Sequence, residues 1–159
     1  MQHTELYQRL SEEIHRIKLI DCHCHIIPFN DLAGKMDVFK LFALYSAYAL
    51  LSSGMSVKDH ELLEQSHGDL EKKWEVFYPY WERIKNTACA KIFLRAMNDL
   101  FGYRTFETET YNDFSKTISQ VYAAENTQWY REVLKEKAGI ALGVIDYGTA
   151  DVNREFFVP

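Results

Sequence analysis

The feature that most constrains the fold is an unbroken apolar run of six residues, 140–145. Continuous apolarity over this length is typical of a strand covered on both faces, as in a parallel sheet. A second strand pattern lies at residues 18–25, and the residues between the two carry helical spacing. Two parallel strands need a long crossover between them, so this order predicts a βαβ-like unit within an α/β fold.

Helical periodicity covers most of the remaining chain. Pro79 lies inside the longest helical pattern and is expected to kink that helix or to begin a new one. Residues 156–158 are apolar and predict the start of a third element. The predicted helices span residues 5–17, 38–51, 57–67, 69–101, 111–124 and 127–137.

The composition of the chain argues against several classes of function. The chain has 159 residues, 47% of them hydrophobic, so it can bury a core. Its net charge of −5 argues against a general nucleic-acid binder. The most apolar helix pattern, residues 38–51, is shorter than the roughly 20 residues that cross a membrane. The polar N-terminus has no secretory pattern, and the three cysteines are an odd count, so we expect a cytoplasmic protein.

Two histidines lie at the end of the strand pattern 18–25. Side chains alternate along a strand, so Asp21, His23 and His25 point to one face, and Cys22 and Cys24 to the other. Neutral imidazole is a common metal ligand, and a bound Zn²⁺ lowers the pKa of its water to about 7. His23 and His25 are therefore predicted to bind a divalent metal ion, with Zn²⁺ as the preferred ion. An inert, hydrogen-bonded pair is the alternative.

The other chemical groups support less specific interpretations. A thiolate zinc site at Cys22 and Cys24 is disfavoured by their alternation with the histidines, and buried packing is preferred. Asp146 ends the second strand pattern and faces either a turn amide or the pocket, with the turn preferred. The remaining candidates are read as structural: the aromatic residues Trp74, Phe77, Tyr78, Tyr80 and Trp81 as core rather than a substrate lid, Arg83, Arg95 and Arg104 as surface ion pairs rather than carboxylate binders, and His60 and His67 as a solvated helix face.

The run Leu19-Ile20-Asp21-Cys22-His23-Cys24-His25 resembles the first barrel strand of the amidohydrolase superfamily. Looser similarity extends over residues 5–159, through Asn86-Thr87-Ala88, Leu94-Arg95-Ala96-Met97, Leu100-Phe101-Gly102, Trp129-Tyr130-Arg131 and Lys137-Ala138-Gly139-Ile140. These segments are similar to the amidohydrolase-related branch, near uronate isomerase.

The resemblance implies a metal-dependent (β/α)₈ barrel in which His23 and His25 are the first two ligands. The family's later ligands and its catalytic acid come from strands further along, and a barrel needs about 250 residues. The expected fold is therefore the N-terminal part of a TIM barrel, largely helical, with a large helical insertion between strands 1 and 2. The expected organisation is one incomplete domain, 1–159: first helix and strand 5–25, insertion 36–138, and second strand with its following segment 140–159.

The chain is expected to be the N-terminal part of a metal-dependent hydrolase and to be inactive on its own. Whether the chain is itself an enzyme stays open at this point, because the later ligands are missing. The alternatives are a uronate-isomerase-like part that acts on a sugar acid, and a non-catalytic, truncated helical domain. The family implies a small-molecule substrate, and neither nucleic acid nor membrane is expected as a partner. Open strand edges beside apolar helices favour a homo-oligomer.

Overall fold

The computed structural model describes residues 4–146 and 153–159. The chain divides into two compact units. One unit combines Met1–Leu32 with Glu125–Pro159, and the other is the continuous segment Ala33–Ala124. Among the described residues, every helix is too short or too polar to cross a lipid bilayer.

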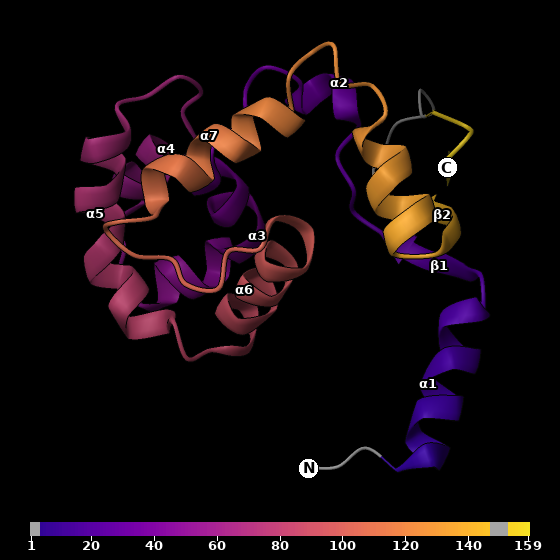
Figure 1. Ribbon diagram of the computed structural model, residues 1–159. Coiled ribbons are helices and arrows are strands. Elements are labelled where there is room, and N and C mark those ends of the chain that lie inside the picture. The colour runs from indigo at the N-terminus through magenta and orange to yellow at the C-terminus, as the bar shows by residue number, and fades with distance from the viewer. Residues whose placement is uncertain (1–3, 147–152) are drawn as a thin grey trace. The chain divides into compact units, whose positions relative to one another are not determined.

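The segment Ala33–Ala124 is a helical unit built around one central helix (Figure 1). The central helix α3 contacts all four of the others. Side chains that precede the helices cap four of the five N-termini, as at Ser56, whose hydroxyl accepts the Asp59 N–H at 3.0 Å. The helices are α3 (Val38–Ser52), α4 (Val57–Glu64), α5 (Leu70–Ile84), α6 (Ala88–Phe101) and α7 (Tyr111–Val121).

The core of the helical unit is aromatic. Phe39 and Phe42 on α3 are fully buried, and so is Phe77 on α5. Phe42 meets Phe77, Trp81 and Phe93 edge-to-face, with ring centroids 4.8–5.6 Å apart. Such geometry adds about 0.5–1.5 kcal/mol per pair beyond the area buried. The aromatic stripe of α5 is therefore core, as the sequence predicted for Trp74, Phe77 and Trp81, whereas Tyr78 is 41% exposed.

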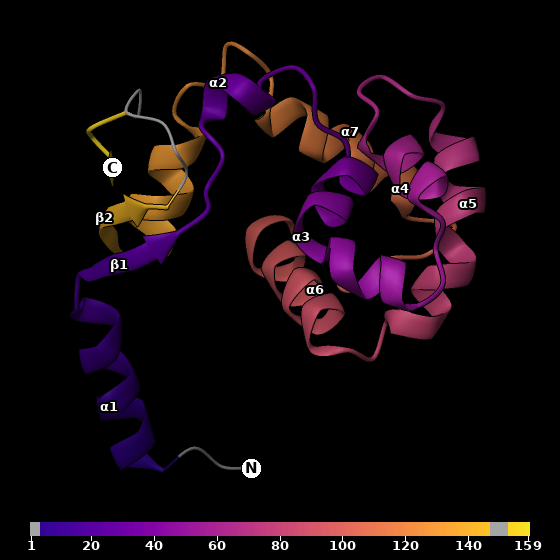
Figure 2. The same cartoon turned by 180° about the vertical axis from the view of Figure 1, so that it is seen from behind.

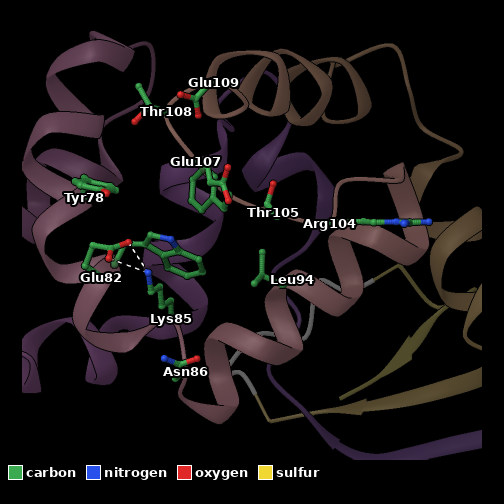
Figure 3. A pocket seen from close by; sticks show the side chains of 12 residues that line it. Tyr78, Glu82, Lys85, Asn86, Leu94, Arg104, Thr105, Glu107, Thr108 and Glu109 are labelled. Atoms are coloured by element: carbon green, nitrogen blue, oxygen red, sulfur yellow. Dashed lines mark hydrogen bonds and ion pairs between the residues drawn. The ribbon is translucent and has the colours of Figure 1, made fainter. Parts of the chain in front are cut away.

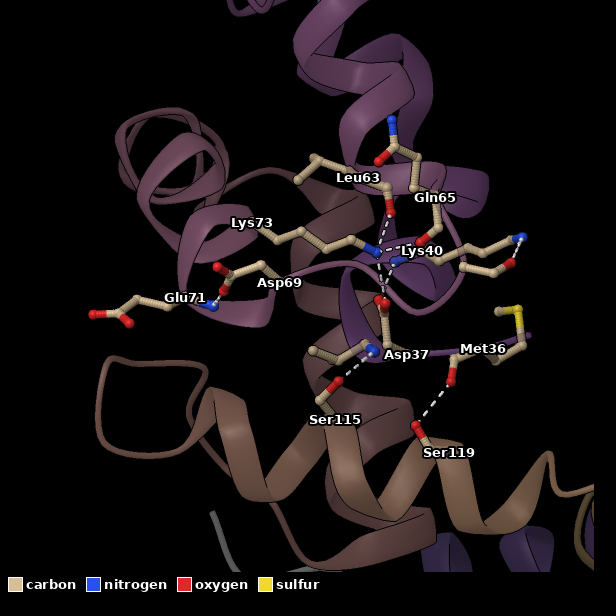
Figure 4. A network of polar contacts seen from close by, with 12 residues as sticks. Met36, Asp37, Lys40, Leu63, Gln65, Asp69, Glu71, Lys73, Ser115 and Ser119 are labelled. Atoms are coloured by element: carbon tan, nitrogen blue, oxygen red, sulfur yellow. Dashed lines mark hydrogen bonds and ion pairs between the residues drawn. The ribbon is translucent and has the colours of Figure 1, made fainter. Parts of the chain in front are cut away.

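A buried ion pair joins three helices of the same unit (Figure 4). Lys73 on α5 is fully buried, and its ammonium donates to Asp37 Oδ2 at 2.6 Å. The same ammonium donates to the carbonyls of Leu63 and Gln65 at the end of α4. Asp37 also caps α3 by accepting the Lys40 N–H at 2.9 Å. All three ammonium hydrogens thus have acceptors, which a buried charge requires.

The unit that combines Met1–Leu32 with Glu125–Pro159 contains a small parallel sheet (Figure 2). Its strands run in the order β1 (Leu19–Cys24), β2 (Ile140–Ile145), β3 (Phe157–Val158), and both pairings are parallel. The π-helix η1 (Arg131–Lys137) packs on β2. The Tyr130 hydroxyl donates to the Ile27 carbonyl at 2.5 Å, which ties the start of η1 to the chain before α2 (Phe29–Leu32). The helix α1 (Glu5–Arg16) precedes β1.

The predicted TIM-barrel part is wrong. The described chain is mainly helical, with eight helical segments and one three-stranded sheet. The two strand patterns were placed correctly and they do pair in parallel, but the sheet stays open at β1 and β3. Strand periodicity reports which faces are covered and not how many strands a sheet contains. A barrel and a small open sheet therefore have the same local signal.

The long helical region is divided at a place other than Pro79, where no new helix begins. Pro79 lies within α5, which continues through it to Ile84. The chain turns instead at residues 85–87, and Thr87 then caps α6 by accepting the Ala90 N–H. The irregular backbone is in α3, where Ser46 has φ −118° and ψ 22°. Proline removes one donor from the helix, and α5 remains helical despite that loss.

Candidate metal centre

The two histidines converge at the carboxyl end of β1. His23 lies in the strand and His25 directly after it, yet their ring centroids are only 4.7 Å apart, at an interplanar angle of 78°. Their Nε2 atoms are 3.0 Å apart, the distance of a hydrogen bond between one ring N–H and the other ring's bare nitrogen. Two nitrogens bound to one tetrahedral Zn²⁺ lie about 3.3 Å apart, given Zn–N bonds of 2.0–2.1 Å. The pair is therefore already near the spacing that one ion needs.

A third group comes from the neighbouring strand. Asp146 follows β2, which pairs with β1 so that Cys24 lies opposite Ile145. The backbone N–H of Asp146 donates to the Cys24 carbonyl at 3.0 Å. Its Oδ2 lies 3.7 Å from His23 Nδ1, and one ligand atom from each of the three residues falls within 4.8 Å of the other two. Asp146 was expected to face either a turn amide or the pocket, and parallel pairing brings its carboxylate to the edge of the sheet where the two histidines lie.

The site is open to solvent. His23, His25 and Asp146 are all exposed, with 63% of the His23 side chain and 67% of the Asp146 side chain accessible. Three protein ligands with a free coordination position are the arrangement of catalytic zinc sites, whereas structural sites are closed by four. The geometry can therefore hold an ion and leave room for water or a substrate atom.

The neighbouring residues of β1 have supporting roles. The Asp21 carboxylate accepts the backbone N–H of His23 at 3.3 Å and so holds the strand rather than a histidine ring. Cys24 is buried, as predicted, but Cys22 is exposed. Burial raises the pKa of the Cys24 thiol, and the Asp21 charge adds to this, against the opposing effect of a hydrogen bond with the Ile26 backbone. A thiol that holds its proton is a poor metal ligand.

The remaining histidines do not join the site. His60 was expected on a solvated face, but it is buried, with Nε2 3.4 Å from the Ala43 carbonyl. His67 lies beyond α4 and has a left-handed backbone, φ 57°. His15 on α1 contacts the Ser11 carbonyl through Nδ1 at 2.6 Å. His3 lies outside the described residues. His60 was misread because helix α4 is short and its burial depends on contact with α3.

The arginines predicted as surface residues behave largely as such. Arg83 donates to the Ser53 carbonyl at 2.8 Å, and Arg95 pairs with Asp99 at 2.5 Å. Arg104 lines a cavity of about 510 Å³ between α5 and the segment 104–109, where its side chain points away from the Glu82–Lys85 pair (Figure 3). The hydrogen bond to Glu82 raises the pKa of Lys85. The mixed charges of this cavity favour no one class of ligand.

Comparison with protein-family models, with curated proteins and with solved structures finds no match. The resemblance to the amidohydrolase superfamily therefore rests on the residues of the sequence itself, and the geometry of His23, His25 and Asp146 is the only structural support for a site at this position within the described residues.

Proposed function

We propose that this chain binds a divalent metal ion of the zinc type through His23, His25 and Asp146, and that the bound ion serves hydrolysis of a small-molecule substrate. The observation that carries the proposal is the 3.0 Å separation of the two Nε2 atoms beside a carboxylate from the adjacent strand. Imidazole nitrogen and carboxylate oxygen form a donor set that suits Zn²⁺.

Each residue has a defined task in this proposal. His23 and His25 would bind the ion through Nε2, each as the neutral tautomer that carries its proton on Nδ1. Asp146 supplies a negative charge and a third donor atom. Its 3.7 Å distance from His23 Nδ1 is too long for a hydrogen bond, so that ring does not hold the carboxylate. Asp21 fixes the backbone of His23 and so the direction of its side chain.

A zinc ion bound at such a site would supply a Lewis acid and would lower the pKa of a bound water to about 7, which is the chemistry that hydrolysis of a carbonyl compound needs. The resemblance to the amidohydrolase superfamily favours this reaction class. The exposure of all three ligands favours a second candidate, a non-catalytic metal-binding site. Activity of the metal-loaded protein distinguishes the two candidates.

Metal titration tests the proposal directly. We expect isothermal titration with Zn²⁺ to give about one ion per chain, and Co²⁺ loading to give the visible absorption of a four-coordinate site. His25→Ala should weaken Zn²⁺ binding at least about 100-fold, and Asp146→Asn about 10- to 100-fold. The matched control is His15→Ala, which removes an exposed imidazole on α1 and should change nothing.

Metal binding should weaken as the pH falls, because a metal ligand binds the ion only in its deprotonated form. The loaded protein is then assayed on aryl esters and amides. Turnover that His25→Ala abolishes supports the hydrolase, and binding without turnover supports the second candidate. Zinc affinity that His25→Ala leaves unchanged would contradict both.

A further inference from the structure

The three residues of the candidate metal centre come from two separate pieces of the chain. The unit that contains the sheet, which we call the sheet unit, combines a first piece, Met1–Leu32, with a second piece, Glu125–Pro159. His23 and His25 lie in the first piece, and Asp146 lies in the second. The whole helical unit separates the two pieces in the sequence. An ion bound by all three residues would therefore join pieces of chain that the sequence places far apart.

The sheet unit has the smaller buried core. Among the described residues, the largest fully buried side chains all lie in the helical unit. The helix η1 packs on β2, but Leu19 and Ile20 of β1 are 50% and 67% exposed, and α1 has no buried residue. The strand β3 adds only two residues to the sheet. Sheets this small depend on a well-covered face for their stability, so the sheet unit is expected to be the less stable of the two units.

The pairing of β1 with β2 is irregular at the end where the histidines lie. Its register shifts between Asp21 and Cys24, the stretch that contains His23. The His23 N–H donates to the Asp21 carboxylate of its own strand. Beyond the shift, the Asp146 N–H donates to the Cys24 carbonyl at 3.0 Å. Metal ligands on both strands would thus add a link where the backbone pairing is least regular.

The helical unit brings the ends of the two pieces together without any help from the metal centre. Within this unit, the Gly34 N–H donates to the Tyr122 carbonyl at 2.6 Å. The first piece ends just before Gly34, and the second begins just after Tyr122. The two pieces therefore leave the helical unit at neighbouring points, which lowers the entropic cost of pairing their strands. None of the three candidate ligands belongs to the helical unit.

We propose that a bound divalent ion controls whether the sheet unit is folded, and that the helical unit folds without it. This inference rests on the metal site of the proposed function and adds a regulatory role for the ion. Asp146 is the residue that couples binding to folding. His23 and His25 are two positions apart, so an unfolded chain can also offer both imidazoles to one ion. The Asp146 carboxylate joins them only when β1 and β2 are paired.

The size of the effect follows from this difference between the folded and the unfolded chain. An ion stabilises the folded state only by the ratio of its affinities for the two states. Loss of the Asp146 carboxylate should weaken Zn²⁺ binding about 10- to 100-fold. Saturating Zn²⁺ should therefore raise the ratio of folded to unfolded sheet unit by about the same factor, 10- to 100-fold. The same ratio for the helical unit should stay constant.

The three tryptophans of the chain report on the two units separately. Trp129 belongs to the sheet unit, whereas Trp74 and Trp81 lie in the core of the helical unit, and all three are buried. Fluorine NMR of the full chain labelled with 5-fluorotryptophan gives a signal for each, and Trp129→Phe identifies the signal of the sheet unit. Urea unfolding is then followed with EDTA and with saturating Zn²⁺. We expect Zn²⁺ to move the midpoint of the Trp129 signal to higher urea and to leave the other two midpoints unchanged.

Asp146→Asn separates the joining of the two pieces from metal binding itself. At a Zn²⁺ concentration that saturates this variant in isothermal titration, the Trp129 midpoint should no longer respond, because both remaining ligands lie in one piece. Glu155→Gln is the matched control. It removes a carboxylate of the second piece that pairs with Arg131 and lies outside the candidate metal centre, so the response to Zn²⁺ should be preserved.

The outcomes distinguish this inference from the proposed function. Zn²⁺ that binds the full chain but leaves the Trp129 midpoint unchanged overturns the inference and leaves the metal site standing. A response that Asp146→Asn retains in full overturns it too, as does a response in which all three signals move together. A chain that binds no Zn²⁺ in isothermal titration overturns both the inference and the proposed function.

Discussion

The two units of this chain bury their apolar side chains to different extents. Helix α3 is covered on several sides, and Val38, Phe39 and Phe42 are fully buried. Helix α1 has the cleaner amphipathic pattern of the two, yet none of its residues is buried. An apolar stripe on a helix therefore predicts which side of the helix is suited to packing, but it does not identify the residues that cover that side. In α3 the partners are other helices of the same unit, whereas the apolar side of α1 faces solvent.

The largest effect should follow from opening the aromatic core. Phe42→Ala removes a fully buried ring that meets three others, and it should lower the free energy of unfolding by about 3–5 kcal/mol. Tyr48→Ala on the same helix removes a ring that is 91% exposed and should change that free energy by less than about 0.5 kcal/mol. Urea unfolding followed by circular dichroism measures both. Equal losses would mean that α3 is not the centre of the unit.

The buried ion pair should have the next largest effect. Lys73→Met keeps the alkyl chain but leaves the Asp37 carboxylate without its cation, so we expect a loss of about 3 kcal/mol, the lower end for breaking a buried pair. Part of the Asp37 charge is still compensated by the Lys40 N–H. Lys85→Met breaks the exposed pair with Glu82 and should leave urea unfolding unchanged. A silent Lys73→Met would contradict the network of Figure 4.

Helix caps sharpen the comparison further. Ser56→Ala removes the cap of α4 and should lower the free energy of unfolding of the helical unit by about 1 kcal/mol. Thr4→Ala removes the corresponding cap of α1, where Thr4 accepts the Tyr7 N–H at 3.4 Å. Since α1 has no buried residue, this change should reduce helicity and shift the main transition by less than about 0.5 kcal/mol. A large shift would mean that α1 is part of the cooperative core.

The smallest expected effect concerns the thiols of β1. Burial raises the pKa of Cys24, so at about pH 8 this thiol should react with a disulfide reagent more slowly than the exposed Cys22. Because the folded state holds this proton more tightly than the unfolded state, the stabilisation is complete at neutral pH. It is lost as the pH rises through the raised pKa. Reaction rates of Cys22→Ser and Cys24→Ser provide the measurement, and equal rates would contradict the burial of Cys24.

Local patterns predicted the helices and strands well. The 3.6-residue period located α1, α3 and α4, and the six apolar residues of β2 were found at their observed bounds. Where two local rules competed, as at Pro79 in α5, the helical period predicted the outcome and the proline did not end the helix. The barrel was the main error, since it required strands whose number no local pattern records.

The candidate site was predicted in part. The alternation of a strand was enough to place His23 and His25 together. Asp146 was identified as a strand-end carboxylate that faces a turn amide or the pocket, with the turn preferred, and parallel pairing of the two strands places it beside the histidines. His60 and Lys73 were missed as buried polar residues, because helical spacing alone does not reveal which face of a short or strongly charged helix is covered.

By itself, the sequence determined what depends on neighbours within a few residues: helix, strand, cap and the convergence of two imidazoles two positions apart. Only the tertiary structure decided what depends on residues far apart in the chain. It brought Asp146 to His23 across 123 positions, buried Lys73 against Asp37, and left the sheet open. The physical reason is that backbone dihedrals and side-chain periodicity act locally, whereas the choice of a packing partner depends on the free energy of the whole fold.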